Sequence, residues 1–149
     1  MNRLDRWFAI GMIAALPQMS GCDKPAGAAA EHEHPATVEK IDGSELSRVT
    51  LTEHAIQRLD VQTAATTEEE SPRTKSSQMA VPYSALLYDP QGNTWVYTSP
   101  QPRTFVREKV EVDYIQNDVV YLKSGPAPGT NIATVGVAEL YGTEFTVGH

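Results

Sequence analysis

The chain has 149 residues, with 12 basic and 19 acidic side chains, a formal net charge of −7 and one cysteine. Nucleic-acid binding and polybasic attachment to a membrane surface both need clustered lysine and arginine, so this charge argues against both classes of protein. The length suits one domain of ordinary size plus a tether. A single cysteine cannot form an intramolecular disulfide bond.

The first 21 residues have the layout of a secretory signal peptide. Arg3 and Arg6 precede an apolar run over residues 7–16, and small residues follow the run. The run is too short for a transmembrane helix, which needs about 20 apolar residues. We therefore expect residues 1–21 to be removed, which leaves ten basic and eighteen acidic side chains and a net charge of −8.

The sequence Met-Ser-Gly-Cys at 19–22 resembles the lipobox of bacterial lipoproteins, whose cysteine becomes the lipidated N-terminus. Lipidation accounts for a lone Cys22 in an exported protein, whereas the alternative is a plain signal peptide with an incidental cysteine. Asp23 follows directly. In Gram-negative lipoproteins this residue commonly marks retention in the inner membrane, so the resemblance implies an anchor there, facing the periplasm. Several acyl chains on one cysteine make such an anchor stable.

Residues 22–47 are rich in alanine, glycine, proline and charge, and they show no sustained apolar periodicity. Such a segment cannot bury enough apolar surface to offset the cost of ordering it. The sequence therefore predicts a flexible stalk over 22–47 that carries one domain over 48–149.

The stalk contains two histidines, His32 and His34, with Glu31 and Glu33 beside them. Imidazole groups separated by one residue can bind copper, zinc or nickel, and carboxylates can complete the ligand shell. A flexible stalk does not pre-organise these ligands, so the site would hold a divalent metal ion weakly. The alternative is a solvated acidic linker. No cofactor is required.

The first structured stretch changes period midway. Val49 and Leu51 alternate with polar residues like a strand, and Thr52 can cap a helix over 53–59. Residues 61–67 return to an extended pattern. The segment 68–79, which is acidic and then rich in serine and threonine, is predicted to be an exposed linker.

The rest of the chain has β patterns. Residues 89–93 contain proline and glycine between two apolar runs, which predicts a β-hairpin. A second stretch alternates over residues 106–114, and a Gly/Pro loop over 124–130 precedes a last apolar strand. The alternation places one set of side chains in a core, namely Val106, Val110, Val112 and Tyr114, and another set in water, namely Arg107, Lys109, Glu111 and Asp113.

These elements predict a mainly β fold, a small antiparallel β-roll or barrel-like domain with one short α-helix. The aromatic residues of its strands should mostly fill the core. The sequence contains no Gly-x-Ser-x-Gly elbow, no phosphate-binding glycine loop and no His-Glu-x-x-His zinc motif. A non-catalytic protein is therefore expected.

Two segments, 49–67 and 81–142, resemble the periplasmic adaptors, or membrane fusion proteins, of resistance-nodulation-division efflux systems. "VPYSALLYDPQGNTWVYT" and "VVYLKSGPAPGTNIATVGVAELYG" are similar to the membrane-proximal domain of these adaptors, and "VTLTEHAIQRLDVQTA" is similar to the opening segment of the heavy-metal branch. Full adaptors carry a lipoyl-like domain, a helical hairpin and most of a β-barrel between such segments. Here about a dozen polar residues replace them.

The resemblance implies an isolated membrane-proximal domain that docks on an inner-membrane efflux pump or on a full-length adaptor. Two predicted loops are candidates for this contact: the hairpin with Asp89, Gly92 and Trp95, and the loop with Pro128 and Gly129. The exported substrates would be metal ions or drugs. The alternative function is a metal-handling lipoprotein that uses the histidine stalk.

Overall fold

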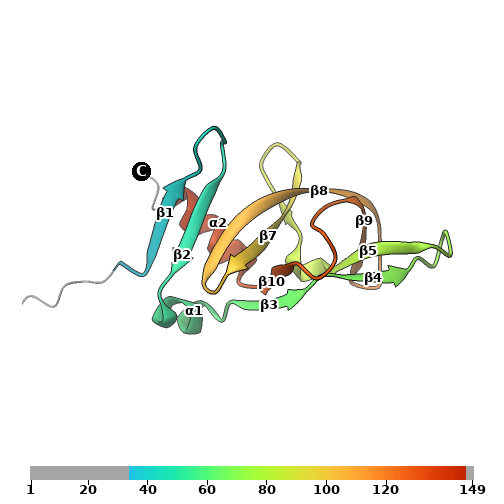
Figure 1. Cartoon of the computed structure of the whole chain (residues 1–149), viewed down its shortest axis with the longest axis horizontal. Coiled ribbons are helices and arrows are strands. Elements are labelled where there is room, and N and C mark those ends of the chain that lie inside the picture. The colour runs from blue at the N-terminus through green and yellow to red at the C-terminus, as the bar shows by residue number, and fades with distance from the viewer. Residues whose placement is uncertain (1–33, 147–149) are drawn as a thin grey trace, which may run out of the picture. The chain divides into compact units, whose positions relative to one another are not determined.

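The computed structural model describes residues 34–146 (Figure 1). This part of the chain is mainly β, with an antiparallel sheet that curls into a half-barrel and with two α-helices. The predicted fold class is confirmed. The elements are β1 (Ala36–Lys40), β2 (Ser47–Leu51), α1 (Glu53–Leu59), β3 (Gln62–Ala65), β4 (Thr67–Glu70), β5 (Ser77–Pro82), the 3-10 helix η1 (Tyr83–Ala85), β6 (Leu87–Tyr88), β7 (Thr94–Gln101), β8 (Thr104–Gln116), β9 (Val119–Ser124), β10 (Asn131–Val135) and α2 (Val137–Thr146).

The strands are hydrogen-bonded in the order β3-β10-β7-β8-β9-β5-β4. The β1–β2 hairpin joins this sheet through β2, which pairs with β8, and β6 pairs with β7. With 13 residues, β8 is long enough to pair with β2 and β7 along its first half and with β9 along its second. Register shifts around Val112 accompany the bend between the two halves.

The central strand β7 is buried on both faces. Its consecutive residues Val96 and Tyr97 point to opposite faces of the sheet, and each is 0% exposed. Val96 belongs to an aliphatic cluster inside the curl of the sheet, here called the curl core. Tyr97 belongs to a cluster on the other face, beneath α2, here called the helix core. The curl core contains Val81, Ala85, Val96, Val110, Val120, Leu122 and Ile132. The helix core contains Ala36, Val49, Leu51, Ala55, Val61, Tyr97, Phe105, Ala133, Val137 and Leu140.

The helix α2 corrects the expectation of one short helix. It begins directly after Gly136, whose φ of 80° turns the chain out of β10. Val137 and Leu140 are buried, and Tyr141 packs partly against the helix core. The spacing of these three apolar residues is that of an amphipathic helix, although Gly142 lowers the helix propensity of the segment.

Strand β1 corrects the boundary of the stalk, which was expected to reach residue 47. Residues 36–40 instead pair with all of β2 in an antiparallel hairpin. Ala36 is buried in the helix core and Val38 packs against it. Two apolar residues in an otherwise polar segment are a weak sequence signal, and they form a strand because β2 and α2 offer them a surface to cover.

The predicted linker over 68–79 is largely a β-hairpin formed by β4 and β5, although most of its side chains are exposed as expected. Its turn is fixed to the sheet. The hydroxyl of Ser71, a residue that is 0% exposed, lies 2.7 Å from the hydroxyl of Tyr114. The guanidinium of Arg73 lies 3.9 Å from the centre of the Tyr114 ring. These contacts make the connection an ordered part of the domain.

The alternation along β8 is confirmed for Val110 and Tyr114, which are buried. It is wrong for Arg107, which was placed in water and is 7% exposed. Arg107 pairs with Tyr97 across β7 and β8, so both side chains lie on the face that α2 covers. The sequence alternation identified two faces of the strand correctly, but a distant helix covers the polar one.

Candidate functional site

Most of the residues expected to anchor the protein or to bind metal lie outside the described residues: Cys22, Asp23, Glu31, His32 and Glu33. His34 is described, and it is exposed just before β1. Within residues 34–146, no three His, Cys, Asp or Glu side chains come close enough to hold a metal ion. None of the helices in this part of the chain is both long and apolar enough to cross a membrane.

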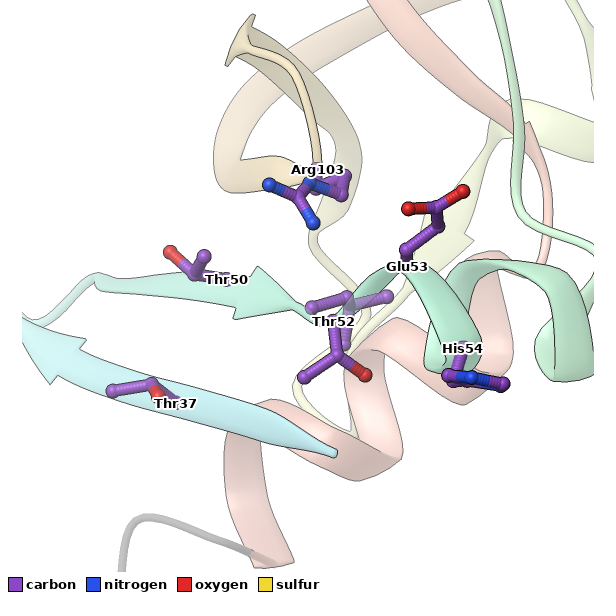
Figure 2. A pocket seen from close by; sticks show the side chains of 7 residues that line it. Thr37, Thr50, Thr52, Glu53, His54 and Arg103 are labelled. Carbon is purple, nitrogen blue, oxygen red and sulfur yellow. The ribbon is translucent and has the colours of Figure 1, made fainter. Parts of the chain in front are cut away.

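A pocket of about 420 Å³ lies where β1, β2 and the start of α1 meet the β7–β8 turn (Figure 2). The hydroxyl of Thr52 caps α1 by accepting a hydrogen bond from Ala55 N at 3.2 Å. Figure 2 shows Glu53 on the same side of the helix start as Arg103, with His54 on the other side of the first turn. The pocket therefore does not gather its ionisable side chains around one point.

The β6–β7 hairpin was predicted from its turn, and the structure confirms the hairpin. The side chain of Asp89 organises the turn by accepting four hydrogen bonds. Oδ1 accepts from the backbone N–H groups of Gln91 and Asn93, at 2.9 and 2.8 Å. Oδ2 accepts from Asn93 Nδ2 and from Trp95 Nε1, both at 2.9 Å. Gly92 has a φ of 82°, which favours glycine.

These bonds explain the acidity of Asp89. Partial desolvation opposes ionisation, but the hydrogen bonds from Asn93, Trp95 and Gln91 outweigh it and lower the pKa of Asp89 from 3.8 to about 2. The carboxylate therefore stays charged throughout the physiological pH range. It also fixes the indole ring of Trp95 at the base of the turn.

The Gly/Pro loop is ordered by Thr66, between β3 and β4. Thr66 donates its hydroxyl to the carbonyl oxygen of Ala127 at 2.9 Å, and its own carbonyl oxygen accepts from Gly129 N at 2.9 Å. Pro128 and Gly129 are exposed. These bonds attach the loop to the β3–β4 connection. The two candidate loops for partner contact therefore belong to different parts of the domain, since the other candidate is the β6–β7 turn.

A second concave surface adjoins the β6–β7 turn and is here called the hairpin groove. It has a volume of about 610 Å³ and lies between the β1–β2 loop, the β6–β7 turn and α2. In Figure 1 the tips of these two hairpins point in the same direction. Glu45 and Leu46 line the groove from the first loop, Asp89 and Trp95 from the second hairpin, and Tyr141 and Phe145 from α2.

Arg107 forms part of the floor of the hairpin groove. Its guanidinium lies 4.7 Å from the centre of the Trp95 ring, 5.0 Å from that of Phe145 and 5.8 Å from that of Tyr141. These are distances at which a cation is attracted to an aromatic face. Arg107 thus joins the two walls of the groove, one on the sheet and one on α2.

Beneath the floor, Glu144 receives two contacts at one oxygen. Tyr97 donates its hydroxyl to Glu144 Oε2 at 2.6 Å, and Arg107 Nε lies 2.8 Å from the same oxygen. The side chains of Arg107 and Glu144 are 8% and 2% exposed, so this ion pair is buried. Burial together with the neighbouring Glu144 carboxylate raises the pKa of Tyr97 well above its usual range, and the phenol stays protonated as a donor.

No protein-family model matches the chain, and no curated protein matches it significantly. Kinship with the efflux adaptors therefore stays a prediction from the sequence segments quoted above.

Of the predicted contact residues, the hairpin groove gathers Asp89 and Trp95. It adds Arg107, Tyr141 and Phe145, which sequence reasoning did not select. The helical spacing of Tyr141 and Phe145 was a readable signal for one shared face of α2. No local pattern could have placed that face beside Arg107, because β8 and α2 lie about thirty residues apart in the chain.

Proposed function

We propose that this protein is a non-catalytic periplasmic lipoprotein that docks on an inner-membrane efflux pump, or on a full-length adaptor of such a pump. In this role it supports the export of metal ions or drugs. Cys22 carries the lipid anchor and Asp23 retains it in the inner membrane. The domain over residues 34–146 supplies the docking surface.

One observation carries the proposal. The two segments that resemble the adaptors are joined edge to edge in one sheet, because β2 pairs with β8 and β3 pairs with β10. The β4–β5 hairpin bridges them, and its turn is held by Ser71 and Arg73 against Tyr114. The sheet of this domain is completed by its own strands, without a lipoyl-like or helical domain, which supports a separate membrane-proximal domain that docks as a unit.

The test is recovery of the partner from membranes. The full-length, lipidated protein is crosslinked mildly in cells, purified by affinity and examined by mass spectrometry. We expect an inner-membrane pump or a full-length adaptor to be enriched over an unrelated lipoprotein that carries the same signal peptide. Equal recovery with both lipoproteins would contradict the proposal.

A Cys22→Ser variant separates the anchor from the docking surface. Without acylation the protein loses the high effective concentration that attachment to the same membrane provides. We expect it to leave the membrane fraction and to recover less of the partner, although the folded domain is unchanged. Full membrane retention of this variant would contradict lipidation at Cys22.

A further inference from the structure

The hairpin groove has the composition of a protein-binding hot spot. The few residues that dominate the binding energy of protein interfaces are enriched in tryptophan, tyrosine and arginine, and Trp95, Tyr141 and Arg107 meet here. Phe145 contacts Tyr141 with ring centres 4.7 Å apart, yet Phe145 is 45% exposed. A large aromatic side chain is therefore left partly in water at the edge of an aromatic cluster.

The guanidinium of Arg107 has more donors than the fold satisfies. A guanidinium has five N–H groups, and the ion-pair contact of Arg107 within residues 34–146 is with one oxygen of Glu144. Even there, no acceptor in the described residues is aligned with the Nε–H. A side chain that is 92% buried and lines a groove thus retains donors for a ligand in that groove.

The charges around the groove determine which ligand these donors suit. Glu45 and Asp89 lie on the two hairpins that form its rim, and the Asp89 carboxylate is ionised because of its four hydrogen bonds. Glu144 already balances Arg107 beneath the floor. An anion would be repelled by the acidic rim, whereas neutral carbonyl oxygens can accept from Arg107 without a charge of their own.

We propose that the hairpin groove docks a loop of the partner protein, which inserts an apolar side chain between Trp95 and Phe145 and offers main-chain carbonyl oxygens to Arg107. The same loop carries a lysine or arginine that meets Glu45 at the rim. This inference rests on the proposed function and assigns its docking surface to residues of β7, β8, α2 and the β1–β2 loop.

Two substitutions test the groove, each with a matched control of the same chemistry elsewhere. Phe145→Ala removes the exposed aromatic wall, and its control is Tyr83→Ala, because Tyr83 is 47% exposed and does not line the groove. Glu45→Arg reverses the charge of the rim, and its control is Glu70→Arg on the exposed strand β4. All four positions are on the surface, so the fold should tolerate them.

The readout is the yield of the pump or adaptor crosslinked to full-length, lipidated protein in membranes. We expect Phe145→Ala to reduce this yield by about tenfold through loss of a hot-spot contact, and Glu45→Arg to reduce it by a similar factor because it repels the partner's lysine or arginine. Each control should leave the yield within about twofold. If the wild type recovers the partner and all four variants do so equally, the groove proposal is overturned while the proposed function stands. If the wild type recovers no partner, both fail.

A photoreactive amino acid in place of Leu46 identifies the occupant directly. Leu46 lines the groove, whereas Ile115, at the far end of β8, is 43% exposed and serves as the control position. We expect Leu46 to crosslink to a peptide of the pump or adaptor that contains an apolar residue and a lysine or arginine. Crosslinking only to a second copy of this chain, only to lipid, or to the pump from Ile115 alone would overturn the proposal.

Discussion

The two faces of the central sheet are packed by different means. Inside the curl, the core is aliphatic, and its strand residues come from β5, β7, β8, β9 and β10. Beneath α2, the core contains Tyr97 and Phe105 and borders a buried ion pair, Arg107 with Glu144. The curl core is built mostly from alternating strand residues, whereas the helix core also needs an element from the end of the described chain.

This difference shows that an alternating strand pattern identifies faces without identifying which faces are covered. Arg107 and Val110 lie three residues apart on β8 and are both buried, Arg107 under α2 and Val110 in the curl. Burying the Arg107 guanidinium removes it from water, and the charge of Glu144 offsets this cost. The Tyr97 hydroxyl in turn donates a hydrogen bond to the Glu144 carboxylate. The helix core therefore holds its helix through a polar contact, and the curl core has no equivalent among its residues.

Breaking the buried ion pair should have the largest effect on stability. Glu144→Leu leaves the buried Arg107 guanidinium without its counter-ion and the Tyr97 hydroxyl without its acceptor, which should cost about 3–5 kcal/mol of the free energy of unfolding. Urea unfolding measures the loss. The triple variant with Arg107→Met and Tyr97→Phe should recover most of it, because no buried polar group is then left unpaired. A cost below about 1 kcal/mol for Glu144→Leu alone would contradict a buried pair.

A matched pair of leucine substitutions compares the packing of the two cores. Leu122 in the curl core and Leu140 in the helix core are 2% and 0% exposed. Each change to alanine should cost about 2–5 kcal/mol, from lost burial plus the cavity that remains. If only Leu140→Ala is tolerated in urea unfolding, α2 is not an integral part of the fold.

Two glycine-to-alanine substitutions near the junction of β10 and α2 should change the free energy of unfolding by smaller amounts and in opposite directions. A Cβ at Gly136, which has a φ of 80°, would lie 2.8 Å from Val61 Cγ2, so Gly136→Ala should cost about 1–3 kcal/mol. Gly142 is the control, since a Cβ there meets nothing within 4 Å and Gly142→Ala in the exposed face of α2 should stabilise by about 0.5–1 kcal/mol. Thermal unfolding of both variants measures these changes in stability. A loss of stability in Gly142→Ala would contradict the placement of Gly142 on the exposed face of a helix.

The smallest effect concerns the rim of the groove at acid pH. Because the folded-state pKa of Asp89 is lowered to about 2 from an ordinary 3.8, its contribution to stability is complete above about pH 4 and is lost as the pH falls through 2. NMR titration of the carboxyl group should give a midpoint near 2. Trp95 fluorescence should change with it, because its indole N–H donates to Asp89.

Asp89→Asn supplies the control for this titration. The variant should lose the fluorescence change between pH 4 and 2, since the side chain no longer ionises. Its unfolding at neutral pH measures how much stability the substitution removes from the turn. A midpoint for Asp89 near its ordinary 3.8 would contradict the four hydrogen bonds.

The β6–β7 hairpin and helix α1 were predicted from local chemistry. The turn contains Pro90 and Gly92 between apolar runs, and Thr52 is a residue type that caps helices. Both signals depend on interactions between residues close in the chain, so the hairpin and the helix could be predicted from the sequence alone. The aromatic residues expected in the core also behave as predicted: Tyr97, Phe105, Tyr114 and Tyr121 are buried, and Trp95 is partly buried.

The elements that sequence reasoning missed depend on partners distant in the chain. Strand β1 has few apolar residues and forms against β2 and α2. Helix α2 has a helical spacing of apolar residues, but Gly142 and flanking strand-like residues weaken the local signal. Local preference is too small to decide such segments, and tertiary packing decides them.

The sequence by itself determined the mainly β class, the period of the strands and the turn that Asp89 organises, because each follows from interactions between residues close in the chain. Only the tertiary structure decided that Arg107 is buried and that the two hairpin tips and α2 enclose a groove. The physical reason is that alternation assigns a side chain to a face of a strand, whereas its burial depends on which element covers that face.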